Sequence, residues 1–175
     1  MRFLVAVVVL IGALTVLNLF LTMAIIRRIK QTNVAPRREG SEIPELEVGT
    51  RIPDFRAEST SGAVVTNADF FGTEAVLAFY DTGCAVCKTT IPKLIDHAQV
   101  NGLKADQVIA VVGGRGNSAA DYVDGLDGAA TVVLEDSLGP VASAFSIPGF
   151  PAFVVVDADG RVVRAGTQST LDARA

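Results

Sequence analysis

Apolar runs, each bounded by polar or turn-forming residues, divide this chain into elements. The first run, residues 3–26, contains no charged residue. As a helix it would extend roughly 36 Å, which is enough to cross a hydrocarbon core of about 30 Å. Its length, and the lack of an A-x-A-like cleavage site after it, favour an anchor over a cleaved signal peptide. The pattern therefore predicts a transmembrane anchor over residues 3–26.

The next segment, residues 27–47, is polar and contains Pro36, Gly40 and Pro44. This composition predicts a linker with little packed structure. From residue 48 onward, short apolar runs alternate with stretches of helical spacing. The runs predict strands over residues 63–66, 75–80, 108–112, 131–134, 152–156 and 161–165, and the stretches between them predict helices over 87–99, 118–126 and 138–145.

This alternation is typical of an α/β fold with a mixed central sheet and helices on both faces. Residues 48–175 are therefore expected to form one domain. Residues 157–160, with the sequence Asp-Ala-Asp-Gly, are expected to make the hairpin turn before the last strand. Pro92 lies inside the first expected helix and predicts a kink there.

The formal charge of −4 is unevenly distributed. Residues 1–40 carry six basic residues and one acid, whereas residues 41–175 carry nine basic and eighteen acidic residues. An acidic domain gives no reason to expect nucleic acid as a partner. Residues 113–116, Gly-Gly-Arg-Gly, match neither G-x-G-x-x-G nor the P-loop pattern, so they predict a flexible loop and no nucleotide site. No cofactor is expected.

The side of the membrane is a question on which two arguments conflict. Five of the six N-terminal basic residues follow the apolar run, and positive charge favours the cytoplasm. The chain's only two cysteines, Cys84 and Cys87, have the C-x-x-C spacing typical of disulfide chemistry, which more often needs a domain outside the cell. The sequence predicts a single-pass membrane protein and leaves both orientations open.

Chemistry in this chain is concentrated at its only two cysteines, Cys84 and Cys87. Their C-x-x-C pair follows the apolar run 75–80 and opens a helix, which is how thioredoxin-like redox sites are built. The helix N-terminus favours a thiolate at Cys84, and a thiolate is the species that attacks a disulfide. Cys87 lies one helical turn away and can resolve the mixed disulfide. With a single histidine, the chain has too few ligands for an ordinary structural zinc site.

Four motifs resemble membrane-anchored thioredoxin-like disulfide reductases of the TlpA/ResA type, and the C-x-V-C-K segment is also similar to MauD, the methylamine dehydrogenase accessory protein. The opening Val-Gly-x-x-Ile-Pro-Asp-Phe is similar to the family's "vGxxaPdF". The central strand precedes the cysteines as in the family, and Cys-x-x-Cys-Lys is followed by a proline. The last motif is Gly-Phe-Pro followed by Asp-Ala-Asp-Gly-Arg. These motifs occupy residues 48–55, 75–80, 84–92 and 149–161.

The resemblance implies a thiol–disulfide oxidoreductase that exchanges electrons with protein thiols and disulfides through Cys84 and Cys87. It also implies that Pro151 is a cis-proline facing the cysteines, and that the backbone of Phe150 pairs with an extended substrate segment. The chain departs from the family where a tryptophan usually precedes the first cysteine, because Gly83 stands there. Ala78 replaces the buried acid of thioredoxin, so Asp81 is the candidate for proton transfer.

Two alternative functions use the same cysteines. A peroxiredoxin-like thiol peroxidase would share the fold, but its P-x-x-x-T-x-x-C motif is missing. Counted back from Cys87, the threonine and proline positions hold Cys84 and Tyr80; counted back from Cys84, they hold Asp81 and Leu77.

A copper-binding chaperone would use the soft ligands of the chain. These are the two cysteines and His97, which the helical pattern places on the polar side of its helix. A surface histidine without a role is the simpler interpretation, and no metal site is predicted.

Overall fold

The computed structural model describes residues 2–6, 11–19 and 46–172. The chain divides into two compact units, residues 1–41 and 42–175. In the first unit, the helix Arg2–Leu19 is long and apolar enough to cross a membrane. A signal sequence near the N-terminus would have the same properties, so this helix indicates membrane anchoring or export. Residues 20–26 of the predicted anchor, and nearly all of the predicted linker, lie outside the described residues.

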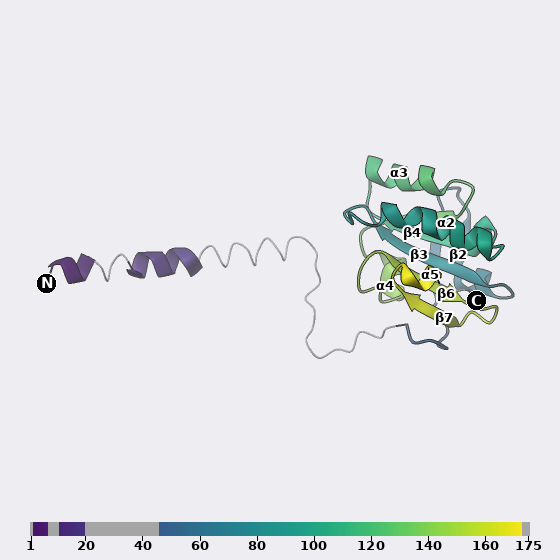
Figure 1. The fold of residues 1–175 in the computed structure, drawn as a ribbon, viewed down its shortest axis with the longest axis horizontal. Coiled ribbons are helices and arrows are strands. Elements are labelled where there is room, and N and C mark those ends of the chain that lie inside the picture. Colours follow the sequence, from purple (N-terminus) through teal and green to yellow (C-terminus); the bar gives the residue numbers. More distant parts are fainter. Residues whose placement is uncertain (1, 7–10, 20–45, 173–175) are drawn as a thin grey trace. The chain divides into compact units, whose positions relative to one another are not determined.

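The second unit is built around a five-stranded mixed sheet (Figure 1). Its strand order is β5-β4-β3-β6-β7, with β3, β4 and β5 parallel and with β6 and β7 antiparallel to their neighbours. The apolar runs of the sequence predicted all five strands. Their bounds are Ala75–Asp81 (β3), Val108–Gly113 (β4), Thr131–Glu135 (β5), Ala152–Val156 (β6) and Val162–Gly166 (β7).

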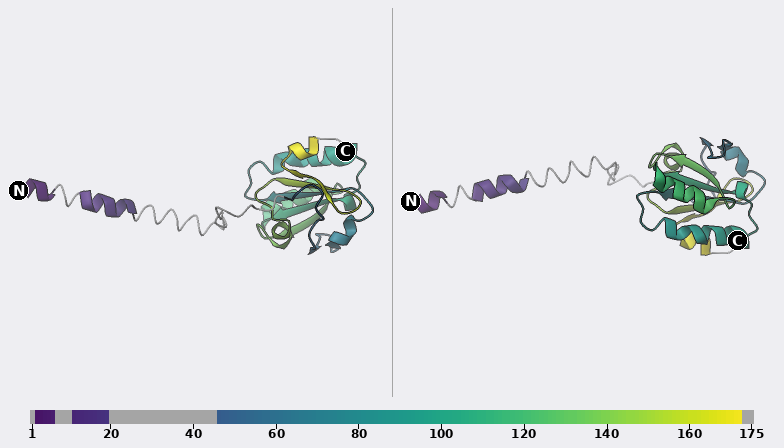
Figure 2. Two further views of the ribbon diagram at one scale, coloured as in Figure 1. Left: turned by 90° about the horizontal axis from the view of Figure 1, so that it is seen from below. Right: turned by 90° about the horizontal axis from the view of Figure 1, so that it is seen from above.

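Helices cover both faces of the sheet, as expected (Figure 2). The chain steps in one direction from β3 through β4 to β5, so right-handed crossovers place both connecting helices on the same face. That face carries α2 (Ile91–Val100), α3 (Asn117–Leu126) and the short α5 (Ser169–Asp172). The opposite face carries α4 (Pro140–Ala144), the 3₁₀ turn η1 (Asn67–Phe70) and the strand β2 (Val64–Thr66). A further 3₁₀ turn, η3 (Ala105–Gln107), leads into β4.

The central strand β3 shows why the core forms two layers. All its residues from Ala75 to Tyr80 are buried, and successive side chains point to opposite faces. Leu77 and Phe79 pack with α4 and η1, whereas Ala78 and Tyr80 pack with α2 and α3. A continuous apolar run is therefore what a strand covered on both faces requires.

The strand β1 (Arg56–Glu58) was missing from the sequence-based interpretation. It pairs antiparallel with β2, and its charged ends are exposed. Three residues with the sequence Arg-Ala-Glu carry no apolar periodicity. The pairing with β2 forms this strand, and its own sequence does not indicate it.

The helix after the cysteines begins later than expected. The 3₁₀ turn η2 (Lys88–Thr90) comes first, and α2 starts at Ile91. Pro92 is the second residue of α2, so it lies in the first turn, where a missing N–H costs little, instead of kinking the interior. The proline thus marks the junction between a 3₁₀ turn and an α-helix.

Candidate active site

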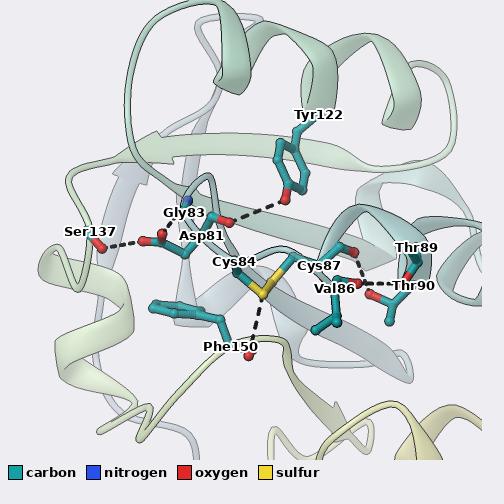
Figure 3. Close-up of a disulfide and its surroundings, with 10 residues drawn as sticks. All are labelled: Asp81, Gly83, Cys84, Val86, Cys87, Thr89, Thr90, Tyr122, Ser137 and Phe150. Carbon is teal, nitrogen blue, oxygen red and sulfur yellow. Dashed lines mark hydrogen bonds between the residues drawn. A yellow bond between two sulfur atoms is a disulfide. The ribbon is translucent and has the colours of Figure 1, made fainter.

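The two cysteines lie at the carboxyl end of β3, in the turn that leads to η2 and α2 (Figure 3). They form a disulfide in this structure, with the two Cα atoms 5.5 Å apart. The backbone N–H of Cys84 donates to the carbonyl oxygen of Asp81 at 3.0 Å, and the N–H of Cys87 donates to the carbonyl of Cys84 at 3.3 Å. The turn is therefore anchored to the last residue of the central strand.

The two sulfur-bearing residues differ in their exposure. Cys84 is partly exposed, and its neighbour Val86 is 57% exposed. Cys87 is completely buried, in the core layer beneath α2 and α3. A reagent or a partner protein can therefore reach the sulfur of Cys84 and not that of Cys87.

The backbone around Cys84 is suited to hold negative charge. In the described part of the chain, the N–H groups of Ala85 and Val86 make no hydrogen bond. They lie at the entry to the helical segment, where N–H groups and the helix dipole favour an anion. These N–H groups are therefore placed to donate to a negatively charged group beside Cys84.

Phe150 and Pro151 lie across from the disulfide. The peptide bond between them is cis, as the resemblance implied. The carbonyl oxygen of Phe150 is 3.6 Å from the sulfur of Cys84, and the close-up shows it directly beneath that sulfur (Figure 3). The loop before β6 is thus brought to the cysteine turn, 66 residues away in the sequence.

Asp81 accepts hydrogen bonds from several residues in and around the cysteine turn. One carboxylate oxygen accepts a hydrogen bond from the N–H of Gly83 at 2.8 Å, and the other accepts one from the hydroxyl of Ser137. Its main-chain carbonyl accepts from the hydroxyl of Tyr122 at 3.3 Å as well as from Cys84. Burial, together with the nearby charge of Asp81, raises the pKa of the Tyr122 phenol.

A second set of buried polar groups lies behind Cys87. The hydroxyl of Thr90 donates to the carbonyl of Cys87 at 2.7 Å. Tyr80 is fully buried beside it, with its ring 5.6 Å from that of Tyr122. Burial raises the pKa of the Tyr80 phenol above its usual range, and the neighbouring Thr90 hydroxyl offsets only part of this effect. These two side chains give the interior of the site a polar, uncharged lining.

Sequence reasoning named the cysteines, Asp81, Phe150 and Pro151, and the structure brings all five into one region. It missed Ser137, Tyr122 and Thr90, whose side chains hold the backbone or the carboxylate of that region. Ser137 and Tyr122 lie on elements distant in the sequence, and no local pattern indicates such contacts.

The expectation for His97 was wrong. The side chain is only 5% exposed, and its Nδ1 atom is 2.9 Å from the carbonyl oxygen of Leu171 in α5. The closing helix α5 covers the face that helical periodicity alone assigned to solvent. Among the described residues, no group of three histidine, cysteine or acidic side chains is arranged to hold a metal ion.

Comparisons with known proteins agree with this geometry. Residues 48–165 match the model of the AhpC/TSA family. The thiol-disulfide oxidoreductase ResA of Bacillus subtilis is 24% identical over 122 residues, which cover 70% of this chain and 68% of that protein. The sequence-based resemblance to ResA-type proteins is thereby confirmed.

Two solved structures share the thioredoxin-like fold. One is the thioredoxin domain of a thiol-disulfide oxidoreductase from Bacteroides vulgatus, with a TM-score of 0.58 and 22% identity over 69% of this chain and 88% of that one. The other is a secreted Mycobacterium tuberculosis disulfide oxidoreductase homologous to E. coli DsbE, with a TM-score of 0.54 and 23% identity over 69% and 96% of the two chains.

Proposed function

Because the chain belongs to the AhpC/TSA family, and its curated relative is a thiol-disulfide oxidoreductase, we propose that it is a thiol–disulfide oxidoreductase of the ResA type that acts on protein thiols and disulfides. One observation carries this proposal. The partly exposed residue Cys84 is paired with a fully buried Cys87, and its sulfur lies 3.6 Å from the Phe150 carbonyl.

Cys84 is the attacking residue and Cys87 the resolving one. In the reductive direction, the Cys84 thiolate attacks a partner disulfide, a new S–S bond forms, and one partner sulfur leaves as a thiolate. The Cys87 thiolate, formed by loss of its proton, then attacks the Cys84 sulfur and releases the second partner sulfur. Two electrons pass to the partner, whose two sulfurs take up protons, and the Cys84–Cys87 disulfide remains. The same steps in reverse oxidise a partner dithiol.

Phe150 and Pro151 position the partner. The Phe150 carbonyl faces the sulfur of Cys84, and Pro151 has no N–H to offer a partner. An extended partner segment that donates a backbone N–H to this carbonyl would bring its own cysteine beside Cys84. This recognition uses the main chain, so it suits partners of differing sequence.

Asp81 is the proposed proton-transfer group, because it is the acid nearest to Cys84 along the chain. Its carboxylate is held by Gly83 and Ser137, and it bonds to neither cysteine. A proton passing between this carboxylate and a cysteine therefore travels through an intervening water.

The domain acts while tethered to a membrane by the N-terminal apolar helix, and we place it on the extracytoplasmic side, where disulfide chemistry predominates. A membrane-impermeant maleimide tests this placement in intact cells. Labelling of Cys84, before or after reduction, supports an external domain. Labelling that requires opened cells would place the domain in the cytoplasm, as the basic residues after the apolar run suggest.

The peroxidase and copper-chaperone alternatives are not favoured. The peroxidase motif is missing around both cysteines. His97, the third soft ligand of the copper hypothesis, is buried and bonded to the carbonyl of Leu171. Purified protein is therefore expected neither to consume hydrogen peroxide at a useful rate nor to retain stoichiometric copper after dialysis.

Disulfide exchange with a fluorescent peptide disulfide tests the main proposal. The wild-type protein reduces the peptide in the presence of dithiothreitol, and Cys84→Ser abolishes the catalysed rate. Cys87→Ser is expected to accumulate a mixed disulfide with the peptide, because the resolving thiol is missing. If Cys84→Ser retained full activity, or if Cys87→Ser formed the mixed disulfide no faster than free cysteine does, the proposed roles would be wrong.

A further inference from the structure

Two glycines at the end of β4, Gly113 and Gly114, face the cysteine turn. Gly113 is paired with Asp81 across the parallel strands, and its carbonyl accepts a hydrogen bond from the N–H of Thr82 at 2.8 Å. The sequence suggested only a flexible loop here. The structure instead places these residues directly against the turn that carries Cys84.

A side chain would be tightly crowded at Gly113 and would clash at Gly114. A Cβ atom on Gly113 would lie 3.0 Å from the carboxylate oxygen of Asp81 and 3.2 Å from the Cα atom of Ser137. A Cβ atom on Gly114 would overlap the hydroxyl of Thr82 and lie 2.9 Å from both its Cβ and Cγ2 atoms. Because most of these atoms belong to Asp81 and Thr82, relief of the contacts by movement of either residue would shift the cysteine turn.

The backbone also requires glycine at one of these positions. Gly114 has a φ angle of +120°, which residues with a side chain rarely adopt. Its N–H donates to the carbonyl of Glu135 at 2.9 Å, which ties it to the last residue of β5, two residues before Ser137. Gly114 therefore lies between the end of β5 and the side chain of Thr82.

We propose that Gly113 and Gly114 are positioning residues for thiol–disulfide exchange, which set the place of Cys84 through Asp81 and Thr82. The chain of contacts is continuous. The glycines abut Asp81 and Thr82, and the Asp81 carbonyl accepts the N–H of Cys84. A displaced turn moves the Cys84 sulfur relative to the Phe150 carbonyl, 3.6 Å away, where the partner segment is to bind. This inference rests on the proposed function and assigns to it residues outside the C-x-x-C motif.

The test compares Gly114→Ala with Gly116→Ala in the full chain. Gly116 also has a positive φ angle, +79°, but a Cβ atom there meets nothing within 4 Å. Both variants carry backbone strain, and only Gly114→Ala pushes on the turn. We expect Gly114→Ala to slow peptide-disulfide exchange about tenfold or more, because small misplacements of reacting groups have large kinetic effects. Gly116→Ala is expected to keep the wild-type rate.

The equilibrium constant between the dithiol and disulfide forms, measured in glutathione, is a second readout that a general loss of stability would not change. If the turn shifts, the N–H groups at the helix entry stabilise the Cys84 thiolate less, and the dithiol form becomes less favourable. Gly114→Ala is expected to shift the equilibrium constant about two- to fivefold toward the disulfide, the range that helix-terminus charge effects span. Thr82→Gly added to Gly114→Ala removes the overlapping atoms and is expected to restore both rate and equilibrium.

Each outcome decides one question. Equal rates and equilibria for Gly114→Ala and Gly116→Ala, or a failure of Thr82→Gly to rescue, would overturn the positioning role. If Gly114→Ala does not fold, Gly113→Ala replaces it, because its Cβ presses on Asp81 without a positive φ angle. An inactive wild-type protein would defeat the proposed function instead, and the glutathione equilibrium would still test the placement of the cysteines.

Discussion

Two turns of this domain begin with the same kind of side-chain hydrogen bond but differ in the other contacts that their aspartates make. Asp81 accepts a hydrogen bond from the N–H two residues later, at Gly83, and Asp157 accepts one from the N–H two residues later, at Asp159, at 2.9 Å. Both are Asx turns that follow a buried strand. The first turn carries the cysteines, and the second joins β6 to β7.

The two aspartates differ in what else their side chains hold. The same Asp157 oxygen accepts a second hydrogen bond from the N–H of Arg161, so this side chain closes its own hairpin. The second carboxylate oxygen of Asp81 instead accepts the hydroxyl of Ser137, from a loop 56 residues away. The Asp157 side chain therefore acts within its own turn, whereas the Asp81 side chain joins the cysteine turn to a distant loop.

The largest expected effect comes from removing each aspartate in turn. Asp81→Ala is expected to slow disulfide exchange about 10- to 100-fold, because the Cys84 sulfur loses its fixed position. Asp157→Ala is expected to leave the exchange rate unchanged. Each change removes hydrogen bonds that contribute about 1 kcal/mol to the free energy of unfolding. Peptide-disulfide kinetics and urea unfolding measure the two quantities, and equal exchange rates for the two variants would remove the distinction between the turns.

A smaller effect separates the positioning role of Asp81 from its proposed role in proton transfer. Asp81→Asn keeps an oxygen that accepts from Gly83 and an amide that donates to Ser137, but it cannot take up a proton at neutral pH. Proton transfer predicts a severalfold loss of rate and the loss of one limb of the pH–rate profile. A wild-type profile in Asp81→Asn, beside a slow Asp81→Ala, would assign this carboxylate to positioning alone.

The smallest effect concerns the buried tyrosines behind the cysteine turn, which have no counterpart at the Asp157 turn. Burial raises the pKa of Tyr80, so the unfolded chain ionises this phenol first. The contribution of this group to the free energy of unfolding is fully present below the usual tyrosine pKa of 10.0. It falls as the pH rises above that value, by roughly 1 kcal/mol per pH unit. Tyr80→Phe is expected to flatten this alkaline loss in urea unfolding between pH 9 and 11. An unchanged slope would mean that Tyr80 does not titrate on unfolding.

The comparison of the two turns also shows how far the sequence could predict this protein. The Asp-Ala-Asp-Gly hairpin was predicted correctly, because the hydrogen bonds of the Asp157 side chain stay within its own turn. The position of the C-x-x-C turn was also predicted correctly, because this turn follows an apolar run that only a buried strand explains. The side of α2 that His97 occupies was predicted wrongly, because the covering helix α5 comes from the other end of the domain.

The sequence by itself determined the five sheet strands, the class of fold and the cysteine pair, because each depends on the periodicity or the chemistry of neighbouring residues. The proline that faces the cysteines was implied only by the resemblance to ResA-type proteins. Only the tertiary structure decided that Cys84 is partly exposed and Cys87 is buried. It also decided that Ser137, Tyr122, Gly113 and Gly114 contact Asp81 and Thr82. The physical reason is that exposure and long-range contacts depend on what packs over a residue. The elements that pack over these residues are distant in the sequence, and they come together at the carboxyl ends of the parallel strands only when the sheet has formed.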